Sequence, residues 1–184
     1  MGLTRRNNNN CIGRNEKGFT LVEMMLYIAI ATVILGSVSA LLLMLFSTRV
    51  KNETILEVEY QGAQVMELIT QTIRNAESVN TPTQGTSETS ISLETLDAGT
   101  NPTIFDAFEN RVRIKKGADP QIFITSDQVT ITNLSFHNLS HTDTPGIIRV
   151  QFTLSHINVE GRNEYDYSQN FYGSANIKQE PAGP

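Results

Sequence analysis

The chain has 184 residues, and its 14 Lys and Arg against 19 Asp and Glu give a formal net charge of −5. This acidic balance argues against a general nucleic-acid binder, which would carry an excess of basic residues. The one cysteine, Cys11, excludes a disulfide framework within a single chain and a cysteine-rich zinc site.

The first 18 residues are polar and basic. Their charged residues are Arg5, Arg6, Arg14 and Lys17, against the single acid Glu16. The asparagine run 7–10 is typical of a disordered, solvated leader. Because that run separates the arginine pair from Cys11, no apolar region lies where a twin-arginine or a lipoprotein signal would need one.

A long apolar segment follows over 19–46, and Glu23 is its only charged residue. The stretch 24–46 spans about 35 Å as a helix, enough to cross a hydrocarbon core of about 30 Å. A secretory signal peptide has a shorter apolar region, of about 7–15 residues, before a small-residue cleavage site. We therefore expect a retained transmembrane helix over 19–46. The more basic N-terminal flank predicts that the N-terminus faces the cytoplasm.

Glu23 needs an explanation, since a carboxylate in a membrane helix is costly. Its place near the start of the run lowers that cost, and the helix dipole favours an anion in the first turn. An interfacial acid that reaches water is one interpretation. A second comes from the spacing of Lys17, Gly18, Phe19 and Glu23 ahead of the apolar run. This segment, Lys-Gly-Phe-Thr-Leu-Val-Glu, resembles the type IV prepilin signal.

The resemblance implies that a membrane-embedded prepilin peptidase cuts between Gly18 and Phe19 and N-methylates Phe19. Glu23 then becomes the fifth residue of a mature chain, 19–184, with 10 bases, 18 acids and a net charge of −8. In the membrane, the Glu23 carboxylate of one subunit can pair with the Phe19 amine of a neighbour. Breaking such a buried pair costs about 3–5 kcal/mol, so the pair would favour correct axial register.

After the membrane segment, apolar and small residues recur every three or four positions. They are Ile55, Val58, Gly62, Val65, Ile69, Ile73 and Ala76. This spacing predicts an amphipathic helix over 47–78. No proline interrupts residues 19–79, so we expect a near-continuous helix from about Thr20 to Ser78, about 88 Å long.

The rest of the chain predicts a β-rich extracytoplasmic head over 79–177 and a disordered tail over 178–184. The Ser- and Thr-rich stretch after Ser78 is interpreted as a loop to about Glu88. The predicted strands are 89–97, 111–116, 121–125, 128–137, 147–159 and 168–177. Their alternation slips after Ile131 and after Leu154, and each slip indicates a bulge or bend. The expected fold is α+β: a long N-terminal helix packed on a small antiparallel sheet of four to six strands.

This order of a long helix and then a β-sheet head is also similar to that of pilins. Major pilins often have a helix-breaking proline at the position that Ala40 occupies here. Its absence favours a minor pilin or pseudopilin, and the phrases VTITNLSFHNL and GIIRVQFTLSHI resemble minor pilins of the PilW type and J-type pseudopilins.

No catalytic motif is present: the chain lacks GxSxG, HExxH, P-loop and GxGxxG patterns. His137 and His141 are four residues apart, but a predicted turn separates them, so metal ligation is not favoured. The stretch 160–166 has three carboxylates without the EF-hand spacing, and a solvated loop is preferred. We therefore expect no catalytic, cofactor or metal site, and no enzymatic activity.

The sequence thus predicts a structural subunit of a type IV pilus or a type II secretion-like pseudopilus. Its expected partners are prepilin peptidase, other pilin or pseudopilin subunits and an inner-membrane assembly platform, with no direct contact to nucleic acid. The expected location is the inner membrane, as a single-pass protein, and then a periplasmic or cell-surface filament. The alternative is an extracytoplasmic binding module that stays anchored in the membrane, and an anchored enzyme is disfavoured.

Overall fold

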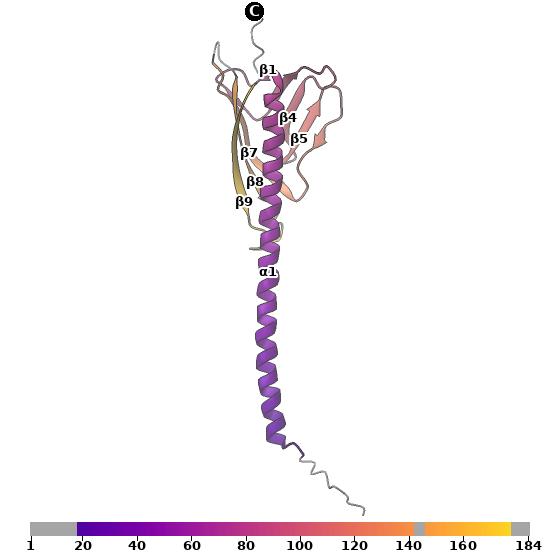
Figure 1. Cartoon of the computed structure of the whole chain (residues 1–184), viewed down its shortest axis with the longest axis vertical. Helices are drawn as coiled ribbons and strands as arrows, with labels where there is room; N and C mark the ends of the chain where they lie inside the picture. Colours follow the sequence, from indigo (N-terminus) through magenta and orange to yellow (C-terminus); the bar gives the residue numbers. More distant parts are fainter. Residues whose placement is uncertain (1–17, 142–145, 178–184) are drawn as a thin grey trace, which may run out of the picture. The chain divides into compact units, whose positions relative to one another are not determined.

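The computed structural model describes residues 18–141 and 146–177, and Figure 1 shows their arrangement. Residues 1–17 of the predicted leader, Lys17 among them, and the predicted tail 178–184 therefore lie outside the described residues. The described elements are α1 (Leu21–Arg74), β1 (Ala76–Thr81), β2 (Ser87–Glu88), β3 (Ile91–Thr95), β4 (Thr103–Phe108), β5 (Arg111–Lys116), β6 (Ile122–Phe123), β7 (Val129–Asn138), β8 (Ile147–His156) and β9 (Ser168–Asn176). The chain divides into two compact units, Met1–Met44 and Leu45–Pro184.

Helix α1 is continuous over 54 residues, as the absence of proline predicts. It ends at Arg74 rather than at Ser78, so the predicted helix was too long at its C-terminal end. The segment from Ser78 to Thr81 is poor in helix formers and pairs with β3 instead. Ala76 fits the three- and four-residue spacing of the helix, but it is the first residue of β1. Its side chain is buried there, 1% exposed, so the apolar pattern continued beyond the end of the helix.

The predicted amphipathic face is confirmed in the second unit, where one stripe of α1 is buried. Its buried residues are Thr54, Val58, Gln61, Gly62, Val65, Ile69, Thr70 and Ile73. The spacing of three and four residues places these side chains on one side of the helix. The apolar members of this stripe, Val58, Val65, Ile69 and Ile73, are the helical part of the hydrophobic core.

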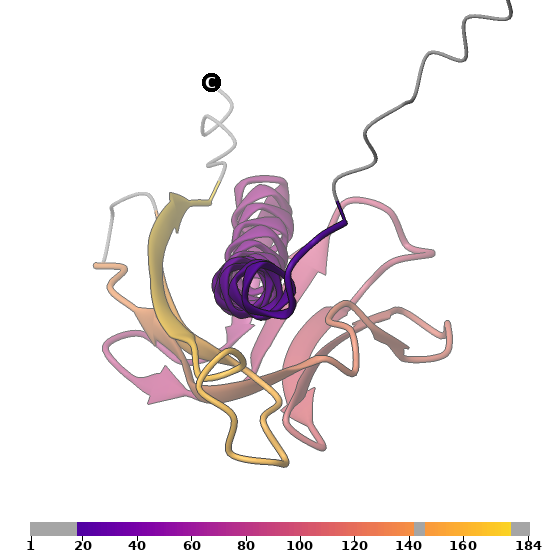
Figure 2. The ribbon, with the colours of Figure 1, turned by 90° about the horizontal axis from the view of Figure 1, so that it is seen from below.

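The strands form two antiparallel sheets rather than the single sheet that the sequence predicts. One has five strands in the order β1-β3-β4-β5-β6, and the other has four in the order β2-β7-β8-β9. Figures 1 and 2 both show β9 on one side of α1 and the β4–β5 hairpin on the other. The described head is therefore α+β, as expected, with nine strands instead of four to six.

Three strands were missed, and their composition explains why. β1 begins in the predicted last turn of the helix, and its second half and β2 lie in the Ser- and Thr-rich stretch that was interpreted as a loop. β4 presents Thr103 and Phe105 to the core, with Thr103 only 1% exposed, so a polar residue occupies an inward position. Alternation of apolar and polar residues cannot reveal a strand when hydroxyl side chains fill buried places.

One of the two predicted irregularities is a bulge, and the other is the end of a strand. The pairing of β7 with β8 shifts between Thr132 and Ser135, and Asn133 there has a φ of 55°. This confirms the bulge after Ile131. β8, in contrast, ends at His156, so Ile157 begins a loop rather than a bend within a longer strand.

The core joins both sheets to the helix. Its largest fully buried side chains include Phe105 from the five-stranded sheet and Phe136 and Phe152 from the four-stranded sheet. The Phe152 ring also stacks on Phe171 of β9 with 5.2 Å between centroids. Tyr167, just before β9, donates a hydrogen bond of 3.1 Å to Glu59 of α1. Desolvation and this hydrogen bond raise the pKa of Tyr167, so the phenol remains a donor.

Gly62 is a point of tight contact between α1 and β9 of the four-stranded sheet. A Cβ atom built at Gly62 would overlap the ring of Phe171. Glycine costs about 1 kcal/mol relative to alanine inside a helix, so this position has a packing reason for its residue.

We predict that Gly62→Ala destabilises the head by about 1–3 kcal/mol, because overpacking outweighs the gain in helix propensity. Thermal unfolding of the full chain in detergent, followed by tyrosine fluorescence, measures the effect. Gly36→Ala on the same helix is the control, since its Cβ would meet nothing within 4 Å. Adding Phe171→Leu to Gly62→Ala should recover part of the loss. An unchanged melting temperature for Gly62→Ala would show that the ring moves aside without cost.

Candidate functional site

Gly18 and Phe19 precede the helix and are open to approach. Both lie outside regular secondary structure, and both are exposed. A Cβ atom at Gly18 would meet nothing within 4 Å, and the Phe19 side chain is 68% exposed. The peptide bond between them is therefore accessible to another protein. Lys17, the third residue predicted for processing, lies outside the described residues.

Thr20 caps the N-terminus of α1. The backbone N–H of Glu23 donates to the Thr20 hydroxyl at 3.2 Å, and the N–H of Met24 donates to the Thr20 carbonyl at 3.1 Å. A threonine followed three residues later by glutamate is the capping-box pattern, and its hydroxyl satisfies an N–H that has no partner within the helix. Sequence reasoning missed this role, although the pattern Thr20-x-x-Glu23 was present to find.

The Glu23 carboxylate turns along the helix and accepts a hydrogen bond from the Tyr27 hydroxyl at 3.1 Å. Residues four apart share a helix face, so this contact is local and follows from the spacing. Glu23 is also the one half-buried residue in the range 18–46, where all other residues are exposed. Its first-turn position places the carboxylate near the positive end of the helix dipole.

Tyr27 contacts both residues predicted to act in assembly. Its ring meets the Phe19 ring edge-on, with 6.1 Å between centroids and 74° between planes, while its hydroxyl holds Glu23. Tyr27 was not predicted from the sequence, although its place four residues after Glu23 is a usable signal. The structure thus brings Phe19, Glu23 and Tyr27 together at one end of the helix.

The apolar part of α1 has the length and composition of a membrane span. It contains an 18-residue window with a mean hydropathy of 2.5, none of it buried against the described residues. Its hydroxyl groups are satisfied within the helix: Ser37 and Ser39 donate to the carbonyls of Val33 and Leu35 at 2.8 Å. Hydrogen bonds from a serine hydroxyl to the carbonyl four residues earlier are favourable in a lipid environment, where each unpaired polar group is costly.

The described residues hold no group of three or more His, Cys, Asp or Glu that could bind a metal ion. His137 lies in β7, and His141 lies three residues beyond the end of that strand. Glu164, in the stretch considered for calcium, pairs instead with Arg162 at 3.6 Å. That stretch is closed by two hydrogen bonds of 2.8 Å between Asn158 and Arg162.

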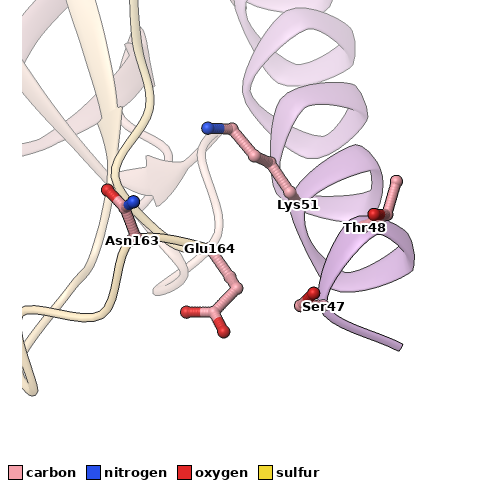
Figure 3. Close-up of a pocket in the computed structure, with 5 residues that line it drawn as sticks. All are labelled: Ser47, Thr48, Lys51, Asn163 and Glu164. Carbon is pink, nitrogen blue, oxygen red and sulfur yellow. The ribbon is translucent and has the colours of Figure 1, made fainter. Parts of the chain in front are cut away.

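A cavity of about 260 Å³ lies between the start of the second unit's helical part and this loop. Its lining residues, shown in Figure 3, are Ser47, Thr48, Lys51, Asn163 and Glu164. One cation comes from the helix and one anion from the loop, so the cavity has no excess of either charge. This lining does not resemble a catalytic constellation, which would bring a nucleophile or a base into hydrogen-bond reach of a partner.

Comparison with known proteins finds one family model, the prokaryotic N-terminal methylation motif, which matches residues 13–39. The matched segment contains Gly18, Phe19, Thr20, Glu23 and Tyr27, and it covers the start of the apolar helix. No curated protein and no solved structure matches the chain.

We predict that Thr20→Ala frays the first turn of α1. Loss of an N-cap costs about 1 kcal/mol, so the amides of Glu23 and Met24, which both hydrogen-bond to Thr20, should exchange hydrogen several-fold faster. Hydrogen exchange with mass spectrometry on the full chain in detergent micelles measures this rate. Thr20→Ser keeps the hydroxyl and should behave like the unaltered chain. Equal exchange in all three proteins would rule out a capping role.

Proposed function

We propose that this type IV pilin-like protein is a structural subunit of a type IV pilus or of a type II secretion-like pseudopilus. The methylation motif over residues 13–39 indicates processing by prepilin peptidase and assembly with other pilin subunits. The exposed apolar part of α1 indicates a single membrane anchor. The α+β head outside that anchor is consistent with the pilin fold.

The proposal rests mainly on the position of Glu23 in α1. A carboxylate stands in the first turn of an otherwise uncharged span, two positions inside the start of the helix and next to the predicted processing point. A permanent anchor gains from an acid there only the interaction with the start of its own helix. A subunit that must dock at a fixed axial position gains a charge with which to recognise its neighbour.

The chemistry of processing creates the partner for that charge. Cleavage after Gly18 would convert the Phe19 amide nitrogen into an α-amino group, and N-methylation leaves it positive. In a filament, the Glu23 carboxylate of one subunit would accept this ammonium from the next subunit. Tyr27 already donates to the same carboxylate, and it would hold Glu23 in a fixed rotamer for that contact.

The remaining assignments follow from this proposal. Residues 1–18 form the cytoplasmic leader, residues 19–46 the membrane and filament-core helix, and the described head lies outside the cytoplasm. The basic leader supports this orientation. An inner-membrane assembly platform would extract the processed subunit into the filament. The uninterrupted helix through Ala40 favours a minor subunit or pseudopilin over a major pilin.

A permanently anchored extracytoplasmic binding module is the second candidate. The exposed apolar helix supports it equally well, because any single-pass protein needs such a helix. Processing at Gly18 separates the two candidates, since an anchored module does not require removal of residues 1–18.

We predict that Gly18→Leu blocks maturation, because a branched side chain would obstruct the approach of the peptidase to the backbone. Intact mass and N-terminal sequencing of the protein from host membranes measure this. The unaltered chain should begin at N-methylated Phe19, whereas Gly18→Leu should retain the leader. Gly13→Leu, the same change inside the leader, is the control and should mature normally. An unaltered chain that still carries residues 1–18 in cells with an active prepilin peptidase favours the anchored module.

We predict that Glu23→Ala is processed normally but enters filaments at least about tenfold less, because the neighbour's ammonium loses its buried partner. Immunoblots of membrane and sheared filament fractions measure the ratio. Glu77→Ala, which removes an exposed acid from β1, should assemble like the unaltered chain. Normal incorporation of the Glu23→Ala protein would refute the role of this carboxylate in setting register.

A further inference from the structure

The bases of the head are concentrated on one strand. Of the six Lys and Arg in the described part of 79–177, four lie in β5. Within that strand, Val112 and Ile114 are buried in the core, so the alternate residues Arg111, Arg113 and Lys115 point out of the five-stranded sheet. An acidic chain thus carries a basic row on one sheet face.

Two aromatic rings lie beside this row. The Arg111 guanidinium lies 4.1 Å from the centre of the Phe123 ring, and that of Arg113 lies 4.5 Å from the centre of Phe108. Phe108 is nevertheless 47% exposed. We call Phe108, Arg111, Arg113, Lys115 and Phe123 the basic–aromatic face. Arginine and aromatic side chains are the residues enriched at protein–protein interfaces, where they often carry most of the binding energy.

The arginines of this face are held in place. Arg113 makes two hydrogen bonds to the Asp106 carboxylate across β4 and β5. Arg111 donates to the Thr125 carbonyl through Nη2 at 2.8 Å. Immobilising long side chains on binding costs about 0.5–1.5 kcal/mol each, and preorganisation removes much of that cost. Asp106 neutralises one base, so the face keeps a net positive charge.

A complementary strip lies on the helical part of the same unit. Leu56 and Tyr60 are 64% and 70% exposed and lie four residues apart, on the side of α1 opposite the buried stripe. Two exposed acids lie on this side, and we call Glu53, Leu56, Tyr60 and Glu67 the acidic helix strip. Glu53 also pairs with Arg49 at 3.1 Å, so Glu67 is the main negative charge of the strip. It lies beyond the apolar span, so the membrane does not account for its exposed apolar residues.

We propose that the basic–aromatic face of one copy docks on the acidic helix strip of a second copy. The two surfaces match in charge, and each adds large exposed apolar groups. They are different surfaces on one chain, so their contact is heterologous, and a heterologous contact that does not close into a ring propagates as a helical filament. This inference rests on the proposed function, and it names the lateral contact that the register pair at Glu23 does not provide.

The outer face of the four-stranded sheet supplies the contrast. Its outward residues Gln151, Thr153, Asn170 and Tyr172 are uncharged and line a separate shallow cavity of about 280 Å³. Arg149 is an isolated exposed base at one end of this face. The four uncharged residues do not complement an acidic strip. They therefore provide matched control positions on the same head.

Cysteine cross-linking between copies tests the proposal, because the only native cysteine, Cys11, can be replaced by serine throughout. One copy carries Ala63→Cys, an exposed position between Tyr60 and Glu67 on the strip. A differently tagged copy carries Ile104→Cys, which pairs with Lys115 in the sheet. The control copy carries Gln151→Cys. A short bismaleimide is applied to cells that express both full-length chains.

We expect Ala63→Cys to cross-link with Ile104→Cys and at least about fivefold less with Gln151→Cys. Lys115→Glu should reduce the specific product by a similar factor, and Glu67→Lys in the other copy should restore most of it. Thermal unfolding of the Lys115→Glu protein checks that the head is intact. Equal cross-linking to Gln151→Cys, or no rescue by the charge exchange, would overturn the proposal.

Membrane and sheared filament fractions are scored separately. Filaments without the specific product would refute the docking and leave the proposed function standing. The specific product in membranes without filaments would support the docking and count against the filament role. Absence of both product and filaments would overturn both.

Discussion

The burial of one stripe of α1 by two sheets is the constraint on which the rest of the head depends. Neither sheet can form a core by itself, since each presents only one apolar face. The stripe that includes Val58, Val65 and Ile69 closes both faces at once. Gly62 allows β9 to approach the helix more closely than any side chain would permit. This shared core also fixes which faces of the helix and of the sheets remain outside, and therefore which surfaces another subunit can meet.

The helix was the most predictable part of the fold, and the sheets were the least. A pattern of three- and four-residue steps survives single exceptions, so the amphipathic stretch could be predicted even though its last turn was placed too far along. The strands depend on alternation over only five or six residues. Where Thr103 fills a buried position, and where Ser- and Thr-rich segments form β1 and β2, that alternation is absent. The partition into two sheets depends on pairing between distant strands, which no local pattern encodes.

The candidate site also has a part that could be predicted from the sequence and a part that could not. The motif predicts Gly18, Phe19 and Glu23 from their spacing, and the structure places Phe19 and Glu23 at one end of the helix. Thr20 and Tyr27 were missed because a single hydroxyl in an apolar segment carries no pattern of its own. Its role becomes clear only from the residue to which it hydrogen-bonds. Both follow from helix geometry once Glu23 is placed: one is three residues before it and the other four residues after it. A search for hydrogen-bond donors three and four residues from Glu23 would have identified both residues.

The position of the helix cap has a consequence for the order of events at the membrane. The first helical hydrogen bond ends on the carbonyl of Thr20, two residues beyond the proposed cut after Gly18. Removal of the leader would therefore break no hydrogen bond of the helix and leave its cap in place. The span would have the same secondary structure before and after processing, and only the charge at its end would change. Cleavage would then act as an electrostatic switch on a helix that is already folded, with no unfolding step to slow it.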